Sequence, residues 1–316
     1  MGDVPNNTMT AFDLTGKRED LSDEISIITP IDSPFYHDIG VADQCTAVKH
    51  EFMTDVIRQP GANKAKYGSD PTIGTSQQPT KLYNIIQLQE ESFSIDDTSN
   101  AVKTAGNSGS YEYQQALKIK ALVGDFEYAF LREVRVDGSA STAPSMRGLL
   151  NWQTTNLDKA DDATLNADGT VTGGTPRDLS KEMVKGVLQD IFTAGGGGQG
   201  KVLTAYCGAI QKTKFDKFYD RDFDRREVAK DAAVDKVDLY ITSFGTVKAQ
   251  VHRTMPADVF TILDLAFWKK ATLVPVGSAE LATTSRSNKK YHMTAQHTLE
   301  AKNEATSGRL TDLSIV

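Results

Sequence analysis

The chain has 316 residues, of which 39% are hydrophobic and 24% charged, so it can form one large domain or two ordinary ones with a sizeable core. Its net charge of −7 argues against a protein that coats DNA through a basic face, although not against one that encloses DNA without gripping it. No apolar run approaches the ~18 residues of a membrane helix, and the first residues lack a secretion leader, so we expect a cytoplasmic chain without a membrane partner.

Residues 1–45 are expected to form an extended arm. They hold one short amphipathic turn, and Pro30 and Pro34 keep the residue before each of them out of helical conformation. A segment of this kind packs poorly on its own. We therefore expect the arm to lie on another surface.

Residues 47–57 and 81–95 are rich in strand-forming side chains, and a long Gly- and Pro-rich stretch separates them. This pattern predicts an extended hairpin. Because a two-stranded hairpin is only marginally stable alone in water, we expect this one to rest on a neighbouring subunit or domain.

The clearest helix is predicted for residues 109–134. Gly109 and Ser110 supply its N-cap region, and Gly138 with the small residues after it ends it. A helix of this length is a rod of about 38 Å. Apolar side chains at 3–4 spacing define its buried face, and these are Ile119, Leu122, Phe126, Ala129 and Phe130.

The second half of the chain alternates helices and strands. Asp168-Gly169 and Gly173-Gly174 mark the turns of a small hairpin or loop. A helix over 178–193 has Pro176, Asp178 and Ser180 as start signals and Met183, Val187, Leu188 and Ile191 as its face. It is followed by a strand at 201–207 and a helix at 209–222. Sheet segments are predicted at 236–253 and 258–276, with turns at Gly245 and Pro256. A long half-buried strand comes last, and its apolar side is Met293, Ala295, His297, Leu299 and Ala301.

The stretch Gly195-x-x-x-x-Gly200-Lys201 matches a phosphate-binding loop except at its last residue. Such a loop lies between a strand and a helix, whose N-terminus then points free N–H groups at the phosphates. Here the predicted order is helix, glycines, strand, and Val202 replaces the Ser or Thr that holds Mg²⁺. We therefore interpret residues 195–201 as a helix-to-strand loop and keep a nucleotide-binding enzyme only as an alternative.

Other patterns that could carry chemistry are incomplete. The stretch HEFMT at 50–54 begins like a zinc-protease motif but ends in Thr, and 220–227 spaces Asp220, Asp222 and Asp224 like a calcium loop with Arg225 where glycine is required. Two cysteines without a CxxC or Cys/His cluster argue against zinc or disulfides, and we expect reduced, buried or half-buried thiols. No histidine has a triad partner at a defensible spacing, and His297, Phe267 and Trp268 are expected to be packing residues. The full histidine set is His37, His50, His252, His292 and His297, and the cysteines are Cys45 and Cys207.

An ordered set of segments resembles the major capsid proteins of tailed bacteriophages of the Hong Kong 97 type. The segments are "TAFDLTGKREDLSDEISIITPIDSPF", "KHEFMTD", "KLYNIIQLQEESFSIDDTSNAVKTAG", "EYQQALKIKALVGDFEYAFL", "MRGLLNW" and "HTLEAKNEATSGRLTDL", and they span essentially the whole chain in family order. The resemblance implies an α+β fold of the Hong Kong 97 type. Its parts would be an N-terminal arm (1–45), an extended loop (46–95), a peripheral domain (96–175) with the spine helix 109–134, an axial domain (176–285) and a return strand of the peripheral domain (286–316).

The same resemblance implies a structural protein rather than an enzyme, with no catalytic, cofactor-binding or metal-binding residues. Its subunits would form hexamers and pentamers of an icosahedral phage head around double-stranded DNA, assembled in the bacterial cytoplasm. Expected partners are other copies, portal and scaffolding proteins, decoration proteins in some heads, and packaged DNA without sequence-specific binding. Because Met1 directly precedes the arm, a separate scaffolding protein is expected.

The resemblance also suggests where subunits would meet. Lys64 and Lys66 lie where some family members cross-link covalently, but no matching Asn or catalytic carboxylate is identifiable. The hairpin and the arm residues Ile25, Ile27, Ile28 and Phe35 are expected to be buried between subunits. An encapsulin-like bacterial compartment shell is the alternative with the same fold, and a minor head or decoration protein would lack the long helix and hairpin.

Overall fold

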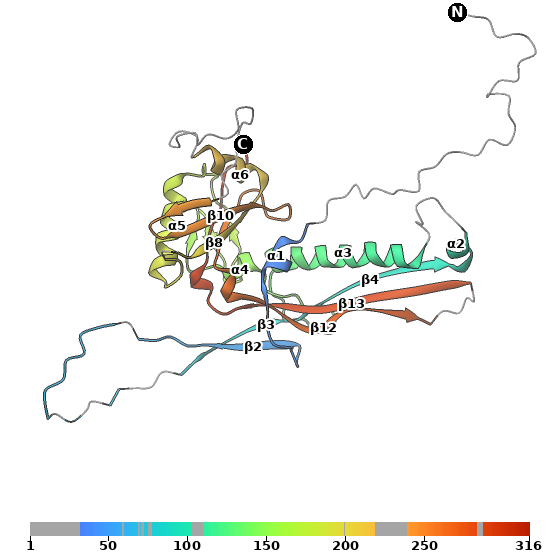
Figure 1. Ribbon diagram of the computed structural model, residues 1–316, viewed down its shortest axis with the longest axis horizontal. Coiled ribbons are helices and arrows are strands. Elements are labelled where there is room, and N and C mark those ends of the chain that lie inside the picture. The colour runs from blue at the N-terminus through green and yellow to red at the C-terminus, as the bar shows by residue number, and fades with distance from the viewer. Residues whose placement is uncertain are drawn as a thin grey trace, which may run out of the picture.

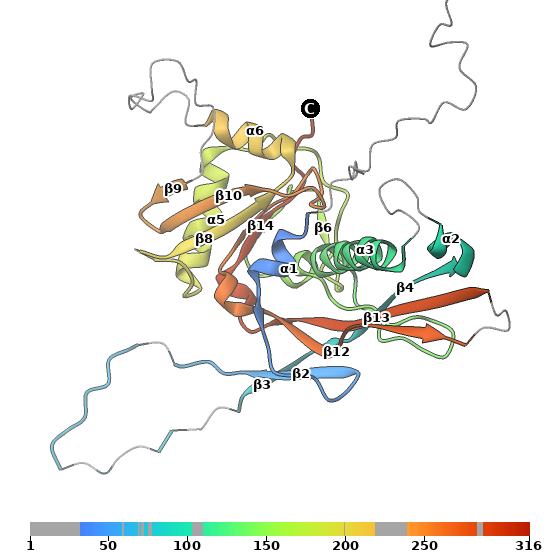
Figure 2. The same ribbon diagram turned by 45° about the vertical axis from the view of Figure 1, so that its right-hand side comes forward.

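The computed structural model describes residues 32–58, 60–68, 70, 73–74, 78–102, 110–198, 200–218, 239–282 and 287–316. A long helix lies along a four-stranded sheet, and a six-stranded sheet with its own helices lies at one end (Figure 1). A two-stranded hairpin projects away from both sheets (Figure 2). The mixture of helices and separate sheets confirms the predicted α+β class.

The four-stranded sheet carries the long helix α3 (Tyr111–Arg132) on one face. Ser110 is the N-cap as predicted, and its Oγ accepts a hydrogen bond from the backbone N–H of Tyr113 at 3.3 Å. The predicted face is fully buried from Leu122 onward, whereas Ile119 is only half-buried. The strand order is β1 (Gly40–Val41), β12 (Trp268–Leu281), β13 (Asn288–Ala301) and β4 (Gln87–Asp96), with β1 parallel to β12 and the other pairs antiparallel.

The last long strand, β13, is half-buried only over its first part. From His297 to Ala301 every residue is buried, so the predicted alternation fails there. The physical reason is that a second element covers the other face: Thr298 Oγ1 donates to the Ile85 carbonyl at 2.8 Å. The root of the hairpin therefore packs on the face that the sequence pattern assigned to solvent.

The six-stranded sheet surrounds a second apolar core. Its central strand β8 (Val202–Cys207) pairs in parallel with β10 (Gly245–Val251) and antiparallel with β11 (Phe260–Leu263). The helix α5 (Lys181–Thr193) begins at the N-cap Ser180, as predicted, and buries Val187, Leu188 and Ile191 in this core. The other members are β5 (Leu157–Asp158), β14 (Gly308–Leu310), β9 (Leu239–Thr242) and the helix α6 (Ala209–Lys217).

Short elements connect the larger ones. The small hairpin predicted around Asp168-Gly169 is present as β6 (Thr164–Leu165) and β7 (Val171–Thr172). The remaining short elements are α2 (Asp97–Ala101), α4 (Leu149–Trp152) and the 3-10 turns η2 (Leu265–Phe267) and η3 (Glu304–Thr306).

The predicted hairpin is present, but its second strand divides in two. β2 (Lys49–Thr54) pairs antiparallel with β3 (Thr80–Ile85), and the chain then crosses at Ile86 into β4 of the four-stranded sheet. Ile86 is buried against Ala271, which fixes the crossing point. The hairpin is thus a continuation of the sheet beneath the long helix.

The end of the predicted arm is folded rather than extended. Residues 32–45 contain the short helix α1 (Pro34–Asp38) and the strand β1, while residues 1–31, with Ile25, Ile27 and Ile28, lie outside the described residues. Phe35 is fully buried inside its own subunit, edge-on to Tyr206 at 5.9 Å, so its predicted burial between subunits is wrong.

The sheets cut across the predicted ranges. β12 falls within the range 176–285 that the sequence assigned to the axial domain, yet it lies in the sheet under α3. Conversely, β5 and β14 fall outside that range and complete the six-stranded sheet. The chain passes between the two units more often than a linear division allows.

A glycine in the β6–β7 turn offers a stability test of this region. Gly169 has φ of +89°, and a Cβ there would lie 2.0 Å from the Asn151 carbonyl oxygen. We expect Gly169→Ala to lower the free energy of unfolding by about 3 kcal/mol, through a backbone clash added to left-handed strain. The matched control Gly173→Ala has φ of +80° but open space, so it should cost only about 1 kcal/mol in the same denaturant titration. Equal losses for the two variants would contradict this packing.

Candidate functional site

The outer part of the hairpin carries exposed large apolar side chains beyond its paired strands. Beyond the paired strands, Ile57 is 90% and Ile73 is 94% exposed, and Tyr67 is also fully exposed. Exposed apolar side chains gathered on a projecting segment mark a surface that binds another molecule. We call residues 55–79 the hairpin tip. Lys64 and Lys66 lie exposed in it.

The root of the hairpin is fixed firmly, in contrast to its tip. The Asn84 side chain is fully buried, and its Nδ2 donates to the carbonyl oxygens of Leu299 at 2.8 Å and Arg147 at 3.1 Å. Its Oδ1 accepts the backbone N–H of Arg147 at 2.7 Å. One amide side chain thereby connects the hairpin, β13 and the segment before α4. A rigid root holds the tip in a defined direction.

A buried carboxylate holds the end of the arm. Glu127 of α3 is 0% exposed, and it accepts the backbone N–H groups of Phe35 at 2.8 Å and Tyr36 at 2.6 Å, in the first turn of α1. Its Oε1 also lies 2.5 Å from His252 Nε2. Because the Thr254 N–H donates to His252 Nδ1, the ring proton is on Nε2 and points at Glu127. We call Glu127 and these partners the arm clamp.

Further contacts connect the arm end to the six-stranded sheet. Tyr206 of β8 donates its hydroxyl to Asp38 at 2.6 Å, and Arg253 pairs with Asp32 at 2.7 Å. Burial, with Asp38 adding to it, raises the pKa of Tyr206 far above its usual range, so this hydroxyl stays protonated. The arm end therefore contacts the six-stranded sheet here and the four-stranded sheet through β1.

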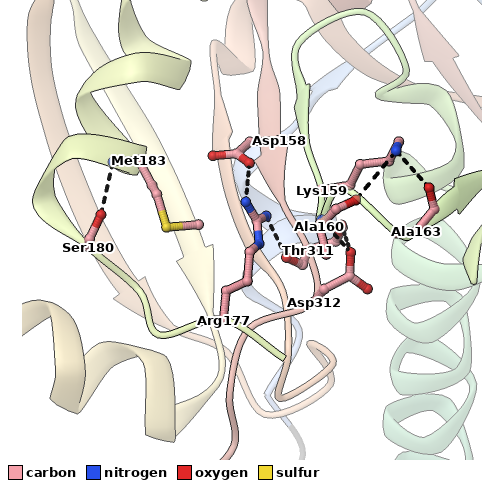
Figure 3. Close-up of polar contacts among 9 residues, drawn as sticks. All are labelled: Asp158, Lys159, Ala160, Ala163, Arg177, Ser180, Met183, Thr311 and Asp312. Carbon is pink, nitrogen blue, oxygen red and sulfur yellow. Dashed lines mark hydrogen bonds and ion pairs between the residues drawn. The ribbon is translucent and has the colours of Figure 1, made fainter. Parts of the chain in front are cut away.

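A polar junction joins the C-terminal segment to the edge of the six-stranded sheet (Figure 3). Arg177 donates to Asp158 at 2.7 Å and to the Thr311 carbonyl at 3.1 Å, while Asp312 accepts the Ala160 N–H at 3.0 Å. Lys159 donates to the Ala163 carbonyl, and Ser180 caps α5 beside the junction. These contacts hold the C-terminal segment against β5, while Arg177 Nε is buried without a hydrogen-bond partner among the described residues.

The glycine-rich loop has the order of elements that the sequence predicts. α5 precedes the glycines and β8 follows them, so the loop leads into a strand and not into a helix N-terminus. Lys201 Nζ lies 3.5 Å from Asp264, and Gly195, Gly197, Gly198 and Gly200 all have positive φ. The loop reverses the chain direction and lacks the geometry of a phosphate site.

The other candidate patterns resolve as follows. HEFMT lies in strand β2 as expected, while 220–227 lies outside the described residues. Within the residues that the structure covers, no group of three or more His, Cys, Asp or Glu side chains is arranged so that it could hold a metal ion. None of the described helices is long and apolar enough to cross a membrane. Cys45 and Cys207 are both unpaired and buried, and Trp268 is a core residue as predicted.

Three histidines have acidic or thiol partners that their sequence spacing did not indicate. His252 meets Glu127, His292 lies 3.5 Å from Glu90, and His50 lies beside Cys45 and Glu300. The fold makes these contacts, whereas the prediction concerned triad partners at a recognisable sequence spacing. A charged residue at position 127, between the buried positions 126 and 130 of one helix, is the one signal that could have revealed the arm clamp.

His297 packs as predicted, and its burial has a consequence for pH. Its Nδ1 lies 2.9 Å from Thr272 Oγ1, and Nε2 has no hydrogen-bond partner among the described residues. Burial, with a smaller contribution from Lys270, lowers the pKa of His297 from 6.5 to about 4.

His297 should therefore lower the stability of the subunit in mild acid. As the pH falls, His297 takes up its proton at a higher pH in the unfolded chain than in the folded one. The stability that depends on neutral His297 is therefore complete above pH 6.5 and is lost as the pH falls toward 4. Between pH 7 and 4.5 the wild-type free energy of unfolding should fall by about 2.5 kcal/mol more than that of His297→Gln. Denaturant titrations at both pH values measure this difference, and parallel losses would contradict it.

Comparison with known proteins finds a capsid-protein family and similar solved capsid structures. The family model described as SU10 major capsid protein matches residues 5–314. The solved capsid of cyanophage A-1(L) is 13% identical with a TM-score of 0.69, over 96% of this chain and 98% of that one. The capsid of a native GTA particle is 12% identical with a TM-score of 0.65 over 96% and 98%, and a structure from Mycobacterium phage Che8 is 12% identical with a TM-score of 0.61 over 94% and 98%. At these identities the structures share the fold, and no curated protein matches the sequence.

Proposed function

Because the chain belongs to the SU10 major capsid protein family, we propose that it forms hexamers and pentamers of an icosahedral phage head that encloses double-stranded DNA. A major capsid protein is a structural component of the virion, and the similar solved structures come from assembled capsids. The proposal adds the symmetry of the assembly and its content. The observation that carries it is the hairpin. Its root is held by buried hydrogen bonds and its tip exposes large apolar side chains, an arrangement suited to binding a second molecule.

The proposal gives each part of the fold a role. Residues 1–45 act as the N-terminal arm and 46–95 as the extended loop. The unit built on α3 is the peripheral domain, which takes most of residues 96–175, the strand β12 and the return strand β13. The unit built on α5 and β8, mostly from 176–285, is the axial domain, whose edges meet at the symmetry axes.

The contacts of the hairpin tip are expected to be chiefly apolar. Ile57, Tyr67 and Ile73 together supply large apolar side chains, and their burial on a neighbouring subunit contributes roughly 1.5–3 kcal/mol for each fully buried side chain. Contacts of this size, repeated at every subunit, stabilise a closed shell even though one contact alone is weak. The net charge of −7 suits a wall that confines DNA without binding each phosphate.

Portal and scaffolding proteins are proposed as further partners, since a head needs an entry for DNA and a template for its size. Negative-stain microscopy of the purified protein, alone and with its scaffolding protein, tests the proposal. Closed shells tens of nanometres across are expected. A monodisperse ~35 kDa monomer under both conditions would contradict it.

A further inference from the structure

Three titratable side chains from distant parts of the chain meet at the root of the hairpin. Cys45 precedes β2, His50 lies in β2, and Glu300 lies near the end of β13. Cys45 Sγ is 3.4 Å from His50 Nδ1, and His50 Nε2 is 3.7 Å from Glu300 Oε2. The order thiol, imidazole, carboxylate is the arrangement that generates a nucleophilic sulfur.

The surroundings of this group favour a charged imidazole. Cys45 first, and then Glu300, raise the pKa of His50 from 6.5 to about 9. Lys302 Nζ lies 3.6 Å from the other oxygen of Glu300 and completes the charged groups around the site. Cys45 also belongs to a small apolar cluster with Ile86 and Ala271, against which Ala42 and Leu273 pack.

Cys45 is buried within an otherwise exposed surface segment. Cys45 is 4% exposed, but Asp43, Gln44, Thr46 and Ala47 on either side of it are all exposed. The Cys45 N–H donates to the Thr272 carbonyl at 2.9 Å, which is what holds the segment down at this point. A small local displacement of the segment exposes the sulfur without unfolding either sheet.

The second cysteine provides an internal comparison. Cys207 lies in the central strand β8 and is 0% exposed, and burial raises its pKa to about 12. Its Sγ donates to the Gln250 carbonyl at 3.7 Å. This thiol should be inert in the folded subunit.

We propose that Cys45 is a nucleophilic modification site for disulfides, with His50 as its proton acceptor and Glu300 as the positioning residue. The thiol proton moves to His50 Nδ1, and the thiolate attacks one sulfur of the disulfide. A new S–S bond forms to Cys45, the original S–S bond breaks, and His50 returns the proton to the departing thiolate. Cys45 is oxidised to the disulfide level while the departing half is reduced to a thiol.

The adduct would have a structural effect at the hairpin root. A group attached to Cys45 cannot fit beside Ile86 and Ala271, which pack at this point, so the segment before β2 must lift away. The inference stands on the geometry of one subunit and does not depend on shell formation. Its failure would leave the proposed function untouched.

The rate of reaction with dithiodipyridine, followed by the absorbance of the released thiopyridone, tests the site in the full-length chain. Cys207→Ser isolates Cys45, and Cys45→Ser isolates Cys207 as the control. An ordinary thiol reacts with a pH inflection near 8.5, while a thiol paired with an imidazolium stays reactive at pH 6. At pH 6 the Cys207→Ser protein should react about tenfold faster than the same protein carrying His50→Gln, because lower nucleophilicity offsets part of the gain in ionised thiol.

The pH profile separates a chemical role from a structural one. Glu300→Gln should shift the inflection upward less than His50→Gln does, and Cys45→Ser should leave only slow reaction. Peptide mass spectrometry of the wild-type chain after brief labelling at pH 6 should find the label on Cys45 and none on Cys207. This measurement uses no variant, so it remains valid even if a variant folds poorly. An inflection near 8.5 in Cys207→Ser, or equal labelling of both cysteines in the wild type, would overturn the proposal.

Discussion

Replacement of residues 57–78 by a two-residue Asn-Gly turn is expected to leave a folded, soluble subunit that forms no closed shells. The paired strands end at Thr54 and Thr80, so the replacement removes only the tip. The free energy of unfolding should stay the same or rise by about 1 kcal/mol, because closing a shorter loop costs less entropy. Shell yield should fall below detection, since every subunit loses the apolar surface through which it binds its neighbour.

Two measurements keep the effects on folding and on assembly apart. Denaturant titration of the unassembled subunit reports folding, and light scattering with negative-stain microscopy reports shells. The single change Ile73→Asp should reproduce most of the assembly defect. Ile315→Asp serves as the matched control, because Ile315 is an exposed apolar residue near the C-terminus. This variant should assemble more efficiently than Ile73→Asp. Normal shells from the tip-deleted protein would show that the hairpin is not an assembly contact.

Removal of the Glu127 carboxylate is expected to be the most destabilising single substitution of a polar side chain in this account. Glu127→Ala leaves the buried Phe35 N–H, the partly buried Tyr36 N–H and the Nε2–H of His252 without this acceptor. Loss of a buried, multiply hydrogen-bonded carboxylate lowers the free energy of unfolding by about 3–5 kcal/mol. The end of the arm should also detach from α3, and limited proteolysis should then cleave near residues 33–38.

Glu112→Ala is the matched control on the same helix. Glu112 is exposed in the first turn of α3, so its removal costs less than about 1 kcal/mol through the helix dipole alone. Urea denaturation of both variants, read by circular dichroism, gives the comparison. A loss for Glu127→Ala no larger than that for Glu112→Ala would show that the arm clamp does not form in solution.

Local pattern was sufficient for most elements. The 3–4 spacing of α3, the N-caps at Ser110 and Ser180, and the Gly-rich turns all depend on residues close together in the sequence, and the structure agrees with each. The order of α5, the glycines and β8 was predicted from such local signals too, and it argued against a phosphate-binding loop. Such signals are local because backbone hydrogen bonding and side-chain spacing are decided within a few turns or strands.

The errors arose where distant segments pack together. Phe35 was predicted to be buried between subunits rather than within its own, because its partners Tyr206 and Glu127 lie about 170 and 92 positions away. The far end of β13 was assigned a solvent face because the hairpin root that covers it comes from residues 84–86. The group of Cys45, His50 and Glu300 was missed for the same reason, since no spacing rule joins residues 250 positions apart.

A reconstruction of the assembled shell by electron cryomicroscopy tests the central claim most directly. Residues 55–79 of each subunit are expected to lie on a neighbouring subunit, with Ile57, Tyr67 and Ile73 buried there. The subunits are expected to be arranged as hexamers and pentamers. A shell in which the hairpin tip folds back on its own subunit, or remains in solvent without a neighbour, would contradict it.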